Sequence, residues 1–266
     1  MNVVLVHGIL GFRRRLGVEY FRGVAEHFRL QGLAVLVPEL DPTRGVEFRG
    51  TQLGEQINAG FLSGAIDRNQ KTHIIAHSMG GLDSRFLLSP ISEKRLEAPV
   101  RSLTTIGTPH RGSPVADLVD KPLDLSPFPH LPFGAAANPL QHVLDDLGIS
   151  LDGLRDLTTS VCEAFSAKFT NDPLVAYFSF AGTGRPNFPQ TASLFLLFHQ
   201  YIFARTGQPN DGMVAVDSAK WGTFYPATWP VDHAEEVGYN LDNPILPPPF
   251  PYLEKFDQIL ARLATL

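Results

Sequence analysis

The sequence contains little cysteine and no long apolar run. Cys162 is the single cysteine among 266 residues, so no disulfide can form within the chain. We expect Cys162 to be a small buried hydrophobe on a helix, because nothing near it in the sequence would activate a thiol. The longest apolar segment, Ala192–Ala204, is interrupted by His199 and Gln200 and is too short to span a membrane. We therefore expect a buried or substrate-facing segment there, and no transmembrane segment.

Basic residues are not in excess either. The chain has 22 Lys and Arg against 27 Asp and Glu, which gives a net charge of -5 at pH 7. Proteins that bind nucleic acid or anionic lipid need a positive surface field, so we expect no nucleic-acid partner. Hydrophobic residues make up 44% and charged residues 18%, a globular composition. The length predicts a single α/β domain over residues 1–266.

We expect no cleavable export signal at the start of this sequence. Residues 1–8 lead directly into a predicted strand, without a basic segment, an apolar segment or a small-residue cleavage site. Such a chain is expected to be cytoplasmic, or to be exported by a route that needs no leader.

Short β-branched runs alternate with helical periodicity through the first hundred residues. This alternation predicts βαβ units, and therefore a mostly parallel central sheet flanked by helices. The predicted strands are Val3–Val6, Ala34–Val37, His73–Ala76, Ser102–Ile106 and, after a long interval, Leu174–Phe180. The predicted helices are Glu19–Leu30, Thr51–Ile66, Met79–Leu88 and Tyr252–Leu263.

The interval 114–173 interrupts this alternation. It opens with a proline-rich stretch, 120–133, and continues with two weak helical patterns. An insertion after a strand of an α/β fold usually covers the carboxyl ends of the strands, so we predict a lid or cap here. A surface excursion packed by its own prolines is the alternative. The apolar residues expected to line the lid are Phe128, Leu131, Phe133, Leu140, Val143 and Leu144.

A strand-turn-helix pattern surrounds Ser78. An apolar strand precedes the serine, small residues stand two positions on either side (Ala76 and Gly80), and a helical pattern follows. This context is typical of a nucleophile elbow, in which the serine occupies a strained turn and larger neighbours would collide. An ordinary strand-to-helix turn is the alternative. We predict that Ser78 is the nucleophile.

Nine histidines compete for the role of general base. On a fold with this elbow, the acid and then the base follow the serine along the chain. His233 lies in a polar loop near the C-terminus, where the base is expected. His199 competes, but it is embedded in an apolar run, where a satisfied core histidine is favoured. His77 and His110 lie beside strand ends and are expected to shape the pocket floor.

The acid that orients the base is predicted to be Asp211. This residue lies on an Asp-Gly turn between the nucleophile and the base in chain order. Turn chemistry alone could also explain the Asp-Gly pair. Asp217 and Asp232 are alternatives, but Asp232 adjoins His233, and successive side chains rarely converge on one ring.

Two backbone N–H groups are expected to bind the oxyanion. One belongs to Met79, directly after the nucleophile, and the other lies in the loop that follows the first strand. In that loop Gly8 and Gly11 let the backbone turn its donors toward the pocket. Ile9 is predicted to provide the second N–H.

These motifs together resemble the true lipases of bacterial family I, the triacylglycerol lipases of the Pseudomonas, Burkholderia and Proteus type. The resemblance runs nearly end to end, and several co-linear motifs are more specific than any single one. The motifs are Val4–Phe12, Tyr20–Phe21, Arg49–Leu53, Ala76–Gly80, Ser102–Ser113, Asn210–Val214 and Asp232–Val237.

The resemblance implies a fold, a set of site residues and a location. The fold is the α/β-hydrolase fold, the catalytic triad is Ser78, Asp211 and His233, and the oxyanion donors are Ile9 and Met79. The resemblance also implies that Arg49 braces the oxyanion loop. His77, beside the nucleophile, is expected to support the site as well. The family is mostly exported, which implies an extracellular protein.

Three departures from the family pattern limit what carries over. The family commonly holds calcium with an Asp two residues after the catalytic His, where this chain has Glu235. Tyr239 replaces a common Gln, and residues 186–204 contain no carboxylate, whereas calcium prefers six to eight oxygen ligands. We therefore expect no metal and no cofactor. No disulfide can tie the acid's loop. The lid segment is proline-rich, so neither interfacial activation nor a preference for long acyl chains carries over, and a compact or absent lid would favour short and medium acyl esters.

These residues predict a serine carboxylic-ester hydrolase, a lipase or esterase. Its substrates would be acyl esters or lipids such as acylglycerols, cleaved through an acyl-enzyme on Ser78. An acyltransferase that uses the same triad and delivers the acyl group to an alcohol is the alternative. A binding protein on a retired hydrolase scaffold is disfavoured by the intact order of the triad.

Overall fold

Parallel strands form the central sheet. The computed structural model describes residues 1–9, 19–93, 95–119, 151–185, 191–243 and 245–266. Within this part of the chain, the strand order is β2-β1-β3-β4-β5-β6 and every neighbouring pair is parallel. The strands are β1 (Asn2–Val6), β2 (Ala34–Leu36), β3 (Thr72–His77), β4 (Val100–Ile106), β5 (Ala176–Phe180) and β6 (Thr223–Phe224). The predicted parallel sheet is confirmed, with β1 to β5 within about two residues of the expected ranges.

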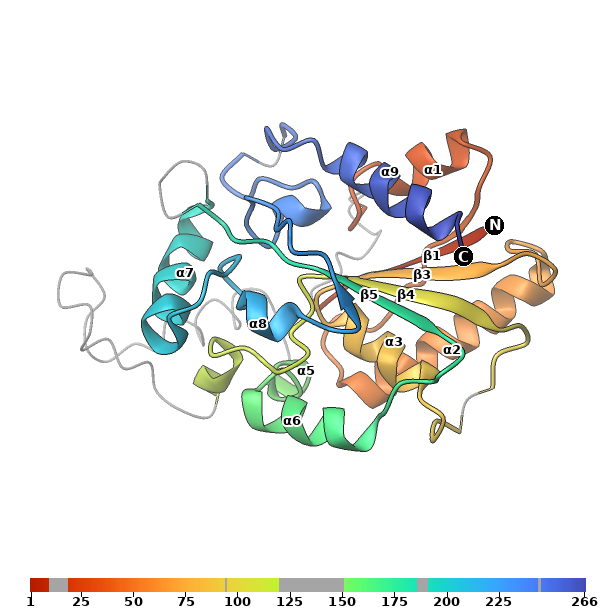
Figure 1. Cartoon of the computed structure of the whole chain (residues 1–266), viewed down its shortest axis with the longest axis horizontal. Coiled ribbons are helices and arrows are strands. Elements are labelled where there is room, and N and C mark those ends of the chain that lie inside the picture. The colour runs from red at the N-terminus through yellow and green to blue at the C-terminus, as the bar shows by residue number, and fades with distance from the viewer. Residues whose placement is uncertain (10–18, 94, 120–150, 186–190, 244) are drawn as a thin grey trace.

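Helices cover both faces of this sheet. On one face lie α1 (Val24–Leu30) and α9 (Tyr252–Leu263), and on the other lie α2 (Val46–Ser63) and α3 (Gly80–Leu88) (Figure 1). Parallel strands that are covered on both faces read as continuous apolar runs, because neither set of alternating side chains meets water. All five residues of β1 are buried, as this arrangement requires.

The side chains of β1 divide between two hydrophobic cores. Val3 and Leu5 pack in the cluster that contains Phe256 of α9, whereas Val4 and Val6 belong to the cluster beneath α2. Successive strand side chains point to opposite faces of a sheet, so one strand supports both helical layers. The carboxyl end of the sheet is thereby fixed from two sides.

Helix α2 differs from its predicted range, Thr51–Ile66. It begins earlier because the carboxylate of Asp156, far along the chain, accepts the N–H of Val46 at 2.7 Å and satisfies its first turn. It ends at Ser63 because Gly64 adopts a left-handed conformation, with φ of 76°. A cap provided by a distant residue leaves no mark in the local sequence.

The bounds of the other predicted helices differ less from those in the structure. The prediction for Glu19–Leu30 was wrong in its first turn, because Gly23 has a left-handed φ of 67° and α1 begins only at Val24. The predicted helix Met79–Leu88 corresponds to α3, and the C-terminal helix was predicted with the observed bounds.

Further helices lie beyond the carboxyl ends of the strands. Figure 1 shows α5, α6, α7 and α8 together at that end of the molecule. The four helices are α5 (Leu151–Arg155), α6 (Thr159–Lys168), α7 (Ser193–Thr206) and α8 (Val216–Ala219). Two short 3-10 helices are η2 (Ala116–Val119) and η3 (Glu235–Val237). The apolar segment around His199 is therefore a helix, α7, and Cys162 is buried on α6 as expected. In the described part of the chain, no helix has both the length and the hydrophobicity to cross a bilayer.

The predicted lid is described only at its two ends, 114–119 and 151–173. The six apolar residues expected to line it lie outside the described residues. The lid therefore stays a prediction.

Candidate active site

Ser78 directly follows β3 on the turn into α3. Its φ is 55°, and it is the one non-glycine residue with a positive φ in the described part of the chain. Such a conformation costs about 1–3 kcal/mol and persists only where the surroundings enforce it. A Cβ on Gly8 would lie 2.6 Å from Cβ of Ser78, and one on Gly80 would lie 2.5 Å from the carbonyl oxygen of Val6. Glycine at both positions lets β1 approach this turn.

Asp211 and His233 form a buried hydrogen-bonded pair. The Nδ1 of His233 lies 2.7 Å from Oδ2 of Asp211, and the backbone N–H of His233 also donates to the carbonyl of Asp211. The other carboxylate oxygen of Asp211 accepts the N–H groups of Met213 (2.8 Å) and Val214 (2.6 Å). Three donors thus hold the Asp211 carboxylate in place. A proton on Nδ1 leaves Nε2 of His233 with a free lone pair, which is the form that a general base requires.

Ser78 follows a residue that contacts this pair. The ring of His77, the residue before Ser78, has its centroid 4.5 Å from that of the His233 ring. Between the described residues, no hydrogen bond joins the Ser78 hydroxyl to His233. Catalytic hydrogen bonds are often long without substrate and tighten in the reacting complex.

The structure does not bring the alternative acids to the base. Asp217 is exposed and forms an ion pair with Lys220 at 2.5 Å. Asp232 is buried, but its carboxylate accepts backbone N–H groups, including that of Ala192 at 2.9 Å. Its side chain therefore points away from the ring of the adjacent His233.

The competing histidines have other partners. His199 donates from Nε2 to the carbonyl of Thr183, as a satisfied core histidine does. His110 is stacked on Trp221 and contacts Arg85. The expectation that His110 shapes the pocket floor stays a prediction.

Arg49 is fully buried and binds the loop that follows β1. Its guanidinium donates to the carbonyls of His7 (2.8 Å), Gly8 (3.3 Å) and Asp41 (2.5 Å). It also pairs with the carboxylate of Asp83 on α3, at 2.7 Å. Burial raises the pKa of Asp83 to about 6, against the opposing effect of Arg49. A planar five-donor fork suits this role, since lysine offers a single point charge.

The side chain of His7 adds a second brace to the same loop. Its Nδ1 lies 2.8 Å from the carbonyl oxygen of Gly8, and its Nε2 accepts the N–H of Leu40. Burial, followed by the nearby Arg49, lowers the pKa of His7 to about 4, so the ring is neutral. The Gly8 carbonyl and the Ile9 N–H belong to one planar peptide unit and point in opposite directions. Fixing that carbonyl therefore fixes the direction of the Ile9 N–H.

The N–H of Met79 lies at the start of α3. Among the described residues it has no hydrogen-bond partner, as expected for the first turn of a helix. Free N–H groups and the helix dipole favour negative charge at this point.

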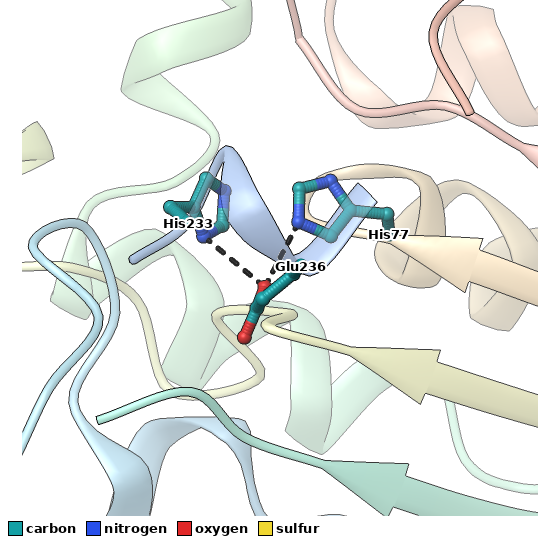
Figure 2. Close-up of side chains that lie close together, drawn as sticks. All are labelled: His77, His233 and Glu236. Atoms are coloured by element: carbon teal, nitrogen blue, oxygen red, sulfur yellow. Dashed lines mark hydrogen bonds and ion pairs between the residues drawn. The ribbon is translucent and has the colours of Figure 1, made fainter. Parts of the chain in front are cut away.

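Sequence reasoning missed the role of Glu236. This residue is completely buried, and its Oε2 lies between two imidazoles, 2.9 Å from Nε2 of His77 and 3.6 Å from Nδ1 of His233 (Figure 2). Burial, and then the nearby Asp211, raise the pKa of Glu236 well above its usual range. Two consecutive glutamates in a polar loop give no sign of burial.

The same three side chains are the one cluster of metal-ligating groups in the described part of the chain. Their geometry does not favour a metal centre. Nδ1 of His233 is already bonded to Asp211, and the 2.9 Å contact between His77 and Glu236 is a hydrogen bond. We interpret the cluster as a hydrogen-bonded network rather than a three-ligand zinc site.

An apolar wall adjoins the site. Ile9 packs against two hydrophobic clusters, one containing Leu154 and Phe195 and the other containing Met79. The Phe195 ring lies 6.4 Å from the His233 ring, with Met213 in the same cluster. The arrangement combines a strained serine, a paired histidine and free N–H donors with apolar surface, which suits attack on an ester that carries an apolar chain.

The sequence is similar to those of known triacylglycerol lipases. The chain is 32% identical over 226 residues to triacylglycerol lipase 2 of Saccharomyces cerevisiae, which covers 84% of this chain and 64% of the yeast protein. It is 26% identical over 259 residues to a triacylglycerol lipase of Vibrio cholerae, covering 88% and 78% of the two chains. This chain thus spans less than two thirds of the yeast relative. No family model matches it.

Solved structures show the same fold. The Staphylococcus hyicus lipase superposes with a TM-score of 0.71 over 99% of this chain and 95% of that chain, at 17% sequence identity. None of the three proteins named here is called an acyltransferase.

Proposed function

We propose that the chain is a lipase of the α/β-hydrolase superfamily that hydrolyses carboxylic esters through an acyl-enzyme on Ser78, and its similarity to triacylglycerol lipases supports this proposal. The observation that carries this proposal is the strained serine beside a histidine that is bonded to a buried carboxylate. Ser78, Asp211 and His233 act as the triad. The substrates are acyl esters or lipids such as acylglycerols.

The first half of the reaction forms the acyl-enzyme. Nε2 of His233 takes the proton of the Ser78 hydroxyl as Oγ attacks the ester carbonyl carbon. Asp211 holds the His233 ring in the productive tautomer and stabilises the imidazolium that results. The imidazolium then protonates the departing alcohol oxygen, and the acyl group remains on Ser78.

The negative oxygen of the tetrahedral intermediate needs fixed donors. The N–H groups of Ile9 and Met79 provide them, with Arg49 and His7 holding the Ile9 peptide unit before substrate arrives. Donors fixed in advance need no reorganisation during the reaction, and each one typically contributes about 10²–10³ in rate. Water then attacks the acyl-enzyme, with His233 again taking the proton, and releases the acid.

The apolar wall around Ile9, Phe195 and Met213 favours an acyl chain over a polar substrate. The alternative reaction, acyl transfer to an alcohol, uses the same triad. The comparisons lend it no support, and it differs from hydrolysis only in the acceptor that reaches the acyl-enzyme.

Glu235, which stands at the family's calcium position, and the neighbouring Asp232 do not fit that ion. Oδ1 of Asp232 accepts the N–H groups of Ala234 and Glu235, and Oδ2 accepts the N–H of Ala192. The carboxylate of Glu235 in turn accepts the N–H of Asp232. Backbone donors thus occupy oxygens that calcium would need, and calcium prefers six to eight of them. The proposed enzyme works without calcium, and no step of the mechanism involves a metal.

A series of p-nitrophenyl esters, from acetate to palmitate, tests the proposal. We expect the wild type to hydrolyse short and medium esters with equal rates before and after treatment with a calcium chelator. Ser78→Ala should lower kcat by about 10⁴-fold or more, because the nucleophile is lost. A wild type that is inactive on every ester would contradict the hydrolase proposal. Transfer to an added alcohol in preference to water would favour the acyltransferase.

A further inference from the structure

We propose that Glu236 acts as an un-ionised acid that donates a hydrogen bond to Nε2 of His77, so that Asp211 remains the one anionic partner of His233. Glu236 is then a positioning residue for the proposed ester hydrolysis, and this inference rests on that proposed function. Its effect extends through His77 to Tyr20.

A continuous chain of contacts carries the proposal. The Tyr20 hydroxyl lies 2.6 Å from Nδ1 of His77, and Nε2 of His77 lies 2.9 Å from Oε2 of Glu236. The same oxygen faces Nδ1 of His233 at 3.6 Å (Figure 2). One carboxyl oxygen thus stands between the residue before the nucleophile and the proposed base.

The fold makes room for this buried carboxyl with two glycines. A Cβ on Gly182 would lie 2.6 Å from Oε1 of Glu236, and a Cβ on Gly107 would collide with Oε2. These glycines directly follow β4 and lie near the end of β5, so the carboxyl occupies the carboxyl end of the sheet. Such a built position distinguishes Glu236 from a surface acid of the same loop.

Two carboxyl groups this close to one histidine cannot both be ionised at low cost. The Asp211 carboxylate accepts hydrogen bonds from the backbone N–H groups of Met213 and Val214 and from the ring N–H of His233. These donors stabilise its anion. Glu236 has no cationic side chain among its described contacts. The titratable groups that face it are His77, His233, Asp211, Asp232 and Tyr20. Asp211 is therefore the anion and Glu236 the neutral acid.

The position of the protons follows from this assignment. Burial, and then the neighbouring His233, lower the pKa of His77 well below its usual range, so its ring carries one proton. If Glu236 donates to Nε2, that proton lies on Nδ1 and is donated to the oxygen of Tyr20. A Cβ on Gly8 would lie 2.8 Å from this oxygen and 3.0 Å from Oγ of Ser78, so the Tyr20 hydroxyl flanks the nucleophile pocket.

The network also settles which carboxyl orients the base. An ionised Glu236 would compete with Asp211 for the proton on Nδ1 of His233, and the ring could turn toward either partner. A neutral oxygen is a much weaker acceptor, since hydrogen bonds to charged groups are about twice as strong. The ring therefore stays directed at Asp211.

Two substitutions of similar size test separately whether the hydrogen-bond donor or the volume of the Glu236 side chain matters. Glu236→Gln keeps a donor for His77 and cannot ionise, whereas Glu236→Met fills the space and has no donor. We expect E236Q to keep kcat/KM within about threefold of the wild type, with the same pH profile. E236M should lower kcat by about 10-fold or more at an unchanged KM, since small misplacements of reacting groups cost up to about 100-fold.

A spectroscopic measurement on the resting protein makes the test independent of activity. At pH 8 we expect the wild type to show an infrared carbonyl band of a protonated carboxylic acid that is missing in E236Q. Glu235→Gln is the matched control and should retain this band. Failure of the ester series alone would contradict the hydrolase proposal and leave this band as the test of Glu236.

Three results would overturn the inference about Glu236. The first is that the wild type and E236Q have the same infrared spectrum at pH 8. The second is that E236M is as active as E236Q, which would show that no donor is needed. The third is that E236Q loses as much activity as E236M, or has a shifted pH profile, which would show that the ionised form is required.

Discussion

At the residue scale, the function depends on partners that hold each polar side chain in one state. Asp211 receives three hydrogen bonds, from Met213, Val214 and His233, so its position is fixed before substrate binds. A buried polar group without partners would cost about 1–3 kcal/mol, and this carboxylate avoids that cost. Its proposed role is to orient His233 and to supply negative charge, and an isosteric substitution tests both.

We predict that Asp211→Asn lowers kcat by about 10⁴-fold. The amide keeps the shape of the side chain but presents a donor where His233 needs an acceptor, and this favours the wrong tautomer. Asp217→Asn is the matched control, because Asp217 is exposed and paired with Lys220. The kcat of D211N and of D217N on one p-nitrophenyl ester would decide which aspartate orients His233. Loss of activity in D217N with retention in D211N would identify Asp217 as the acid.

At the scale of elements, the junction between β1 and α3 positions Ser78, the proposed nucleophile. Gly80 in the first turn of α3 faces the backbone of β1, where a Cβ would lie 2.5 Å from the carbonyl oxygen of Val6 and 2.8 Å from that of His7. Neither carbonyl can move without disturbing the sheet. Any side chain at this position must therefore push α3 away from β1, together with Ser78 and Met79.

We predict that Gly80→Ala lowers kcat by about 100-fold and destabilises the fold by about 1–3 kcal/mol. Gly60→Ala is the matched control, because Gly60 lies in α2 and the nearest atoms to its Cβ would be side-chain atoms of Leu36 and Ile66, at 3.1 Å or more. Alanine is also about 0.5–1 kcal/mol more favourable than glycine within a helix. Urea unfolding and kinetics measure both effects. Full activity in G80A would contradict the claim that α3 and β1 approach too closely to admit a side chain at this position.

At the scale of the whole molecule, buried carboxyl groups make stability depend on pH. Burial, together with the nearby Asp232, raises the pKa of Glu235 to about 7, from an ordinary value of 4.5. The folded protein holds this proton more tightly than the unfolded chain does. The stability that results is fully present below about pH 4.5 and is lost as the pH rises through 7.

We predict that Glu235→Gln becomes more stable relative to the wild type as the pH rises from about 4.5 to 7. Glutamine cannot ionise, so the variant does not lose this contribution, and the difference should stay constant above that window. Thermal midpoints of both proteins across the pH range measure the effect. A difference that is equal at every pH would show that burial of this carboxyl is not linked to ionisation.

The sequence by itself determined the fold class and the order of the chemistry. The apolar runs of β1 and β3 predict strands that are buried on both faces, and the small residues around Ser78 predict the strained turn that the structure contains. Asp211 and His233 could be singled out because chain order and local turn chemistry are properties of the sequence. Those signals depend on neighbours along the chain, which a sequence displays directly.

The tertiary structure alone decided what depends on distant partners. The cap that Asp156 provides for α2 spans 110 residues, and the burial of Glu236 depends on Gly107 and Gly182 from two other segments. The two-residue β6 exists only because β5 lies beside it. Such features arise from packing between segments. The sequence around an acidic loop residue does not show whether packing will exclude solvent from its carboxyl group.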